Sequence, residues 1–170
     1  MLKLSVTEWI VLALIDEQDR HGFSIARELK AGGPIGEVWT VPRPLVYRAI
    51  QRLEADGLIE PVLTERGDKG ANRTIYSISS GARNSLAKWL GEPVDHPRDA
   101  RTELMAKILL LARQGRRADQ LAARQLEHFQ PALLGLQRKA AEAEGSEHIV
   151  ALLRLESLKA IIRVLKTIGG

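Results

Sequence analysis

The chain has 170 residues, of which 45% are hydrophobic and 27% charged, and its formal net charge is +4. This length supports one compact domain, or a small domain with a helical extension, and the composition is that of a folded globular protein. Because the sequence contains no cysteine, it excludes disulfides, thiolate metal sites and cysteine nucleophiles, and it fits a reducing compartment.

The N-terminal sequence lacks the basic and then apolar run of a signal peptide, because acidic residues interrupt its hydrophobic stretch. No segment approaches the roughly 18 uninterrupted apolar residues that a membrane-spanning helix needs. We therefore expect a cytoplasmic protein with no membrane partner.

Three helices are predicted before residue 57. Ser5 and Glu8 have the spacing of a capping box, so a first helix should begin there and end near Asp16. A second, short helix is expected over residues 23–30. Pro44 suits the first turn of a third helix, where a missing N–H costs nothing. The buried face of this third helix should carry Val46, Ala49, Ile50 and Leu53.

After Gly57 the apolar pattern changes to that of strands. Residues 58–63 and 74–78 flank a polar, glycine-bearing stretch, as expected for a long β-hairpin. Pro61 indicates that the first of these strands lies at a sheet edge. Proline has no backbone N–H, so within a sheet it is tolerated mainly where no neighbouring strand needs that donor. Three helices followed by a hairpin is the order of a winged helix-turn-helix.

The rest of the chain is predicted to be helical. A fourth helix should cover residues 80–90, and residues 91–99, with two prolines, are the expected linker. The fold class is therefore mainly α with a small β-hairpin: a winged helix-turn-helix domain at 1–90 and a helical dimerisation domain at 100–170. The last helix is apolar on several sides, and a second copy of the chain could cover it. The residues expected to carry dimerisation are Leu152, Leu155, Leu158, Ile162 and Leu165.

Candidate DNA contacts gather on the third helix. In a helix-turn-helix this helix enters the major groove, so its outward face should meet phosphates and base edges. That face carries Arg43, Tyr47, Arg48, Gln51 and Arg52, and the hairpin tip adds Arg66, Lys69, Asn72 and Arg73. Each cation alone could equally belong to a solvated surface. Their place within the helix and hairpin order favours DNA, with Arg48 contacting either a phosphate or a guanine.

Three motifs resemble the PadR family of transcription regulators. Residues 11–15 (VLALI) with 21–25 (HGFSI), residues 46–59 (VYRAIQRLEADGLI) and residues 73–81 (RTIYSISSG) are similar to its helix, recognition-helix and wing patterns. The chain differs from the family pattern at Leu45, which replaces a serine or threonine and removes a hydroxyl, and at Ser79, which replaces a threonine.

The resemblance implies a homodimeric repressor whose C-terminal helices hold the dimer. It also implies a partner in double-stranded operator DNA and, where a small-molecule effector exists, an operator affinity tuned by that ligand. The resemblance further implies that Tyr47 contacts DNA and that His21 and Gly22 form the junction before the second helix.

No pattern of catalysis or metal binding is evident. The four histidines are scattered without ligand spacing, and no phosphate loop, nucleophile elbow or zinc-protease motif occurs, so we expect no enzyme, metal or cofactor. Trp9, Trp39 and Trp89 could form an aromatic ligand clamp, but core packing is the commoner role of tryptophan. The competing function is a winged helix that binds only proteins.

Overall fold

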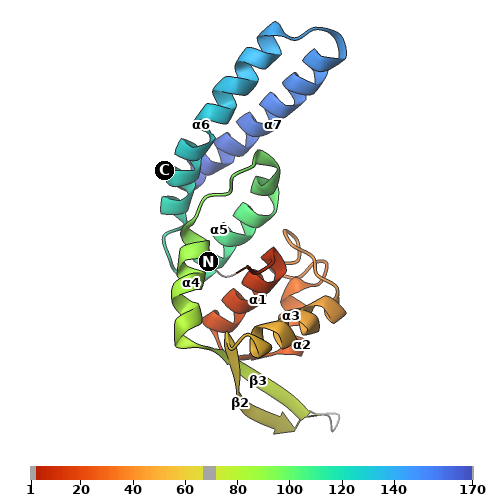
Figure 1. The fold of residues 1–170 in the computed structure, drawn as a ribbon, viewed down its shortest axis with the longest axis vertical. Helices are drawn as coiled ribbons and strands as arrows, with labels where there is room; N and C mark the ends of the chain where they lie inside the picture. Colours follow the sequence, from red (N-terminus) through yellow and green to blue (C-terminus); the bar gives the residue numbers. More distant parts are fainter. Residues whose placement is uncertain (1–2, 67–71, 170) are drawn as a thin grey trace. The chain divides into compact units, whose positions relative to one another are not determined.

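The structure is a computed structural model that describes residues 3–66 and 72–169. It contains two compact units, Met1–Gly91 and Glu92–Gly170, and Figure 1 shows the elements of each. The first unit contains α1 (Val6–Glu17), β1 (Arg20–His21), α2 (Gly22–Leu29), α3 (Arg43–Ala55), β2 (Ile59–Arg66), β3 (Asn72–Ile78) and α4 (Ser80–Gly91). The second contains the 3-10 helix η1 (Pro97–Arg101), α5 (Glu103–Arg113), α6 (Ala118–Glu142) and α7 (Gly145–Gly169).

Helix α1 is the central element of the first unit. It begins with the predicted capping box, in which the Ser5 hydroxyl accepts from the Glu8 amide and the Glu8 carboxylate accepts from the Ser5 amide. All residues from Glu8 to Ile15 are buried, because α3, β3 and α4 pack around the helix. Trp9 and Trp89 stack in this core with ring centroids 5.4 Å apart. Both are 5% exposed, which favours core packing over a ligand clamp.

Helix α3 has clear start and stop signals. Pro44 lies in its first turn, as predicted, and Val46, Ala49, Ile50 and Leu53 are its buried residues. At its end Gly57 adopts a left-handed φ of 68°. This conformation lets the Gly57 amide donate to the Glu54 carbonyl and the Leu58 amide donate to the Leu53 carbonyl, the bonds of a Schellman C-cap.

The sheet of the first unit is antiparallel with the strand order β1-β3-β2. Strand β2 lies at an edge, as Pro61 predicted. Both hairpin strands are longer than predicted, and in Figure 1 they extend away from the helices of their unit as a two-stranded ribbon. The two-residue strand β1 was not predicted, because two residues have no periodicity to detect.

Helices α6 and α7 form an antiparallel hairpin in the second unit. Ala140, Ala151 and Leu155 form a buried cluster between them, and Leu133 and Leu136 pack against it. Leu155, one of the residues predicted for dimerisation, is therefore buried within its own chain. Among the described residues, no helix combines the length and the apolar composition that crossing a bilayer requires.

Residues 91–99 were expected to be a linker, and within this stretch Glu92 and Val94 are hydrogen-bonded inside the second unit. The side chain of Gln125, which is fully buried, accepts from the Val94 amide at 2.7 Å and donates to the Val94 carbonyl at 2.9 Å. The buried Lys107 donates to the Glu92 carbonyl at 3.1 Å and pairs with Glu103 at 2.8 Å. These bonds satisfy polar groups that burial would otherwise leave unpaired.

Candidate nucleic-acid interface

Helix α3 buries one apolar face and exposes a mostly polar face, on which Leu45 is an exposed apolar residue. The face opposite the buried residues is exposed and bears most of the predicted DNA contacts: Arg43, Tyr47, Arg48, Gln51 and Arg52. The acidic residues Glu54 and Asp56 come only at its C-terminal end. Arg43 lies at the N-terminus of the helix, where the helix dipole also favours anions, whereas Arg52 lies in the last turn.

Four side chains from three elements meet beside the start of α3, and we call them the Phe23 cluster: Phe23, Arg43, Tyr47 and Arg73. The Arg43 guanidinium carbon lies 5.5 Å from the centroid of the Phe23 ring and 5.5 Å from that of Tyr47. The Arg73 guanidinium carbon lies 5.9 Å from the Phe23 centroid. These distances are within the range of cation–π attraction. The cluster thus joins α2, α3 and β3.

His21 and Gly22 shape the junction from which this cluster is built. The Nδ1 atom of His21 accepts from the Ser24 amide at 3.1 Å and so caps α2. A Cβ atom on Gly22 would lie 2.9 Å from Cε1 of Tyr47 and 3.1 Å from Cδ1 of Ile50. Only glycine allows the Tyr47 ring to pack this closely against the start of α2.

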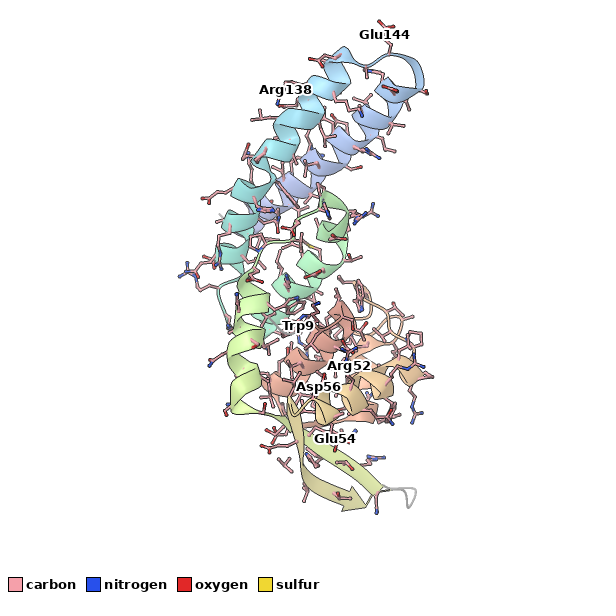
Figure 2. All side chains as sticks on the ribbon, in the orientation of Figure 1. Trp9, Arg52, Glu54, Asp56, Arg138 and Glu144 are labelled. Atoms are coloured by element: carbon pink, nitrogen blue, oxygen red, sulfur yellow. The ribbon has the colours of Figure 1, made fainter. Side chains whose placement is uncertain are left out.

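Arg52 is engaged within the protein. Its Nε atom lies 3.5 Å from Oε1 of Glu8 and 3.7 Å from Oδ2 of Asp56, and its side chain is 55% exposed. Figure 2 labels Arg52 and Asp56 near the end of the same helix. Arg52 therefore ties α3 to the start of α1, whereas Arg48 and Gln51 are exposed to solvent.

Strands β2 and β3, which we call the wing, are joined to the C-terminal end of α3. The Tyr76 hydroxyl on β3 donates to Oε2 of Glu54 at 3.3 Å. Burial raises the pKa of Tyr76 above its ordinary value, and the charge of Glu54 raises that pKa further. Of the predicted wing contacts, Asn72 is exposed and Arg73 lies in the Phe23 cluster. Lys69 and the side chain of Arg66 lie outside the described residues.

A shallow, mostly apolar groove of about 330 Å³ borders the cluster, between α2 and the segment that leads into α3. Arg27, Lys30 and Arg43 contribute to its lining. The groove is lined by Phe23, Ala26, Arg27, Lys30, Ala31, Thr40, Val41, Pro42 and Arg43. Cationic side chains therefore continue from α3 onto the neighbouring surface of α2.

The residues predicted for dimerisation divide into two groups. Leu155, Leu158, Ile162 and Leu165 are buried within the chain, whereas Leu152 is 43% exposed. Other apolar side chains of α7 are also exposed, with Ile149 and Leu153 each at 68%. Over the described residues, no three or more His, Asp and Glu side chains come together in a group that could hold a metal ion.

Sequence reasoning did not single out Phe23, Glu8 or Glu54 as part of this surface. Phe23 could have been identified from the sequence, because it is an aromatic residue that follows His21 and Gly22 directly at the start of a short predicted helix. The partners of Glu8 and Glu54 are distant in sequence, so spacing alone could not identify them.

Comparison with known proteins agrees with this arrangement. Residues 11–88 match the model of the "Transcriptional regulator PadR-like family". The chain is 26% identical over 91 residues to the "Probable transcriptional regulator Rv1176c" of Mycobacterium tuberculosis, a match that covers 54% of this chain. The chain spans about half the length of this curated relative, 47% of it.

A solved structure extends the likeness of the fold to both units. The crystal structure of Bacillus subtilis PadR in complex with operator DNA is similar with a TM-score of 0.51 and 20% sequence identity, covering 97% of this chain and 98% of that one. At this identity the match concerns the fold, mainly helical with a small antiparallel sheet. Residues 11–88 therefore resemble the PadR-like family of transcriptional regulators.

Proposed function

We propose that the protein is a homodimeric, ligand-responsive repressor that binds a double-stranded DNA operator in the cytoplasm. The observation that carries this proposal is the exposed cationic face of α3, which continues through the Phe23 cluster onto β3. A helix fits the major groove of B-DNA, and arginine and glutamine are side chains that read base edges there. The match of residues 11–88 to the PadR-like family model supports regulation of transcription rather than catalysis.

Each residue group has a separate role in this proposal. Arg48 and Gln51 face the groove from the middle of α3, and Tyr47 offers a hydroxyl to a phosphate. Arg43 and Arg73 meet the backbone beside the helix, while Asn72 and the predicted hairpin contacts Arg66 and Lys69 meet it from the wing. Arg52, which is already paired with Glu8 and Asp56, contributes mainly to the shape of this surface.

The test of DNA binding is a mobility shift with the protein's own upstream region at several salt concentrations. Affinity should fall steeply between about 50 and 200 mM salt, since each phosphate contact releases counterions. Charge reversal of Arg43 and Arg48 together should abolish the shift, and charge reversal of Arg163 on α7 is the matched control. If the protein binds no duplex, or if the reversed variant binds normally, the competing function as a protein-binding module gains support.

The exposed apolar residues of α7 support the homodimer. Ile149, Leu153 and Val164 are exposed at 68%, 68% and 49%, and unpaired apolar side chains at this density are typical of an interface. Replacing Ile149 and Leu153 with serine should give a monomer in sedimentation. Val62→Ser, at a residue 50% exposed on β2, is the control. A dimer that persists in the double variant places the interface elsewhere.

Ligand responsiveness has a test of its own. A thermal-shift screen with small aromatic and cationic compounds should find ligands that raise the melting temperature, because a ligand that binds only the folded state stabilises it. A true effector must also change the affinity for DNA, so each compound found is then added to the mobility shift. A ligand with no effect there is not the effector.

A further inference from the structure

The Phe23 ring is a point where the helix-turn-helix and the wing meet. Its side chain is 43% exposed at the start of α2, although phenylalanine is usually buried. Arg43 comes to it from the start of α3 and Arg73 from β3, at 5.5 and 5.9 Å from the ring centroid. One exposed ring is therefore shared by two cations from distant parts of the sequence.

This geometry leaves the guanidinium of Arg43 able to bind an anion. A cation–π contact uses the face of the guanidinium or its positive charge, while the N–H donors lie in the guanidinium plane. Arg43 contacts two rings, Phe23 and Tyr47, and within the described residues no ion pair joins it to a carboxylate. An arginine held by rings keeps donors that a carboxylate would occupy.

Phe23 is itself held in place. His21, whose Nδ1 caps α2, lies against it with ring centroids 6.3 Å apart. Ala26, Val41 and Pro42 line the same groove as Phe23 and give it apolar neighbours. A ring fixed in this way restricts the rotamers of the arginines that lie over it, which lowers the entropy that they lose on binding.

We propose that Phe23 is a positioning residue for DNA binding, which holds Arg43 and Arg73 together so that both meet one stretch of phosphate backbone. This inference rests on the proposed function. It assigns to an apolar side chain a role that its own chemistry does not suggest, since Phe23 acts through the two arginines. It also predicts that the recognition helix and the wing contribute to affinity as one unit.

The experiment uses the full chain and a fluorescein-labelled duplex of mixed sequence, about 30 base pairs long, titrated by anisotropy between about 50 and 200 mM NaCl. The variants are Phe23→Leu, Phe23→Met and Phe23→Tyr, each also measured for melting temperature. The matched control is Leu134→Ala, at an exposed apolar residue of α6. Phe23→Leu is then combined with Arg43→Ala and Arg73→Ala.

Phe23→Leu and Phe23→Met should weaken binding roughly five- to thirtyfold, since two cation–π contacts of about 0.5–1 kcal/mol each are lost. The salt dependence should become shallower, while Phe23→Tyr and Leu134→Ala should stay within about twofold of the parent. In the background lacking both arginines, Phe23→Leu should change affinity by less than about twofold.

Two results would overturn the inference without affecting DNA binding itself. The first is that Phe23→Leu and Phe23→Met bind DNA with the same affinity and salt dependence as the parent protein. The second is that Phe23→Leu weakens DNA binding as much in the protein lacking Arg43 and Arg73 as in the parent, and also lowers the melting temperature. This would show that the Phe23 ring serves only the stability of the fold. If the parent protein does not bind the duplex even at about 50 mM salt, the proposed function fails, and this inference fails with it.

Discussion

The carboxylate of Glu8 caps α1 with one oxygen and meets Arg52 of α3 with the other. Oε2 accepts from the Ser5 amide at 2.6 Å and from its hydroxyl at 2.9 Å, and Oε1 lies 3.5 Å from Arg52 Nε. Glu8 is only 7% exposed. The capping box, which is a local feature of the sequence, therefore also fixes where the third helix ends against the first.

The ion pair with Glu8 gives Arg52 a role in stability that Arg48, on the same helix, does not share. Arg52→Ala should lower the free energy of unfolding by about 0.2–1 kcal/mol, the range of a partly exposed ion pair, and Glu8→Gln should remove part of the same energy. Arg48→Ala should leave unfolding unchanged but weaken DNA binding. Urea denaturation and anisotropy titrations measure the two effects. Equal stability losses in Arg48→Ala and Arg52→Ala would contradict this division.

Arg48→Ala also distinguishes a base contact from a phosphate contact. Loss of a phosphate contact should weaken binding to every sequence alike, whereas loss of a guanine contact should relax preference at one base pair by about 1–3 kcal/mol. A panel of operator variants, each with one base pair changed, tells the two apart.

Tyr47→Phe should weaken DNA binding by about 0.5–1.5 kcal/mol for an ordinary hydrogen bond, and by about 1.5–3 kcal/mol for one to a charged phosphate, with little change in melting temperature. Gly22→Ala should weaken DNA binding as well, because the added Cβ at 2.9 Å from Cε1 displaces the Tyr47 ring. Gly81→Ala, at a helical glycine whose Cβ would meet nothing within 4 Å, is the control. Normal binding by Gly22→Ala would show that the position of this ring is unimportant.

Gly57→Ala should destabilise the first unit by about 1–2 kcal/mol, since a left-handed residue with a side chain carries that cost. The left-handed φ of 68°, rather than space, is the reason, because a Cβ here would meet no atom within 4 Å. Gly57→Asn should cost less, as asparagine tolerates this conformation better. Chemical denaturation measures both, and equal losses in the two variants would point to another cause.

Tyr76→Phe should change the response of stability to alkaline pH. Because burial and Glu54 raise the pKa of Tyr76, the folded protein keeps the phenolic proton to higher pH than the unfolded chain does. The stability that this proton contributes is complete below the ordinary pKa of 10.0 and is lost as pH rises through the folded value. Urea midpoints at about pH 8 and about pH 10.5 should therefore differ less in Tyr76→Phe than in the parent.

Local signals predicted the elements of this fold well. The capping box of Ser5 and Glu8, the first-turn Pro44 and the edge-strand Pro61 each express a constraint on nearby backbone, and each is confirmed. Periodicity also gave the buried face of α3. What these signals could not give is the partner of a side chain that lies far away in sequence.

The last helix and the wing illustrate this limit. The apolar residues of α7 indicate that the helix is covered, but the pattern is the same whether α6 or a second chain covers it, and the structure buries Leu155 and Leu158 within the chain. Arg73 was predicted from its charge alone, whereas its place beside Phe23 depends on how β3 packs against α2 and α3. Contacts between residues distant in sequence, such as these, depend on tertiary packing.

The paired hydrogen bonds between Gln125 and Val94 imply a narrow choice of residue at one position. The buried amide of Gln125 both donates to and accepts from the backbone of Val94, as a neighbouring strand would. Leucine or glutamate at this position has a similar size but would leave at least one backbone group of Val94 without its hydrogen bond. In a saturation library sorted for folded protein, position 125 should therefore keep glutamine almost alone, while the adjacent exposed Arg124 should accept most residues.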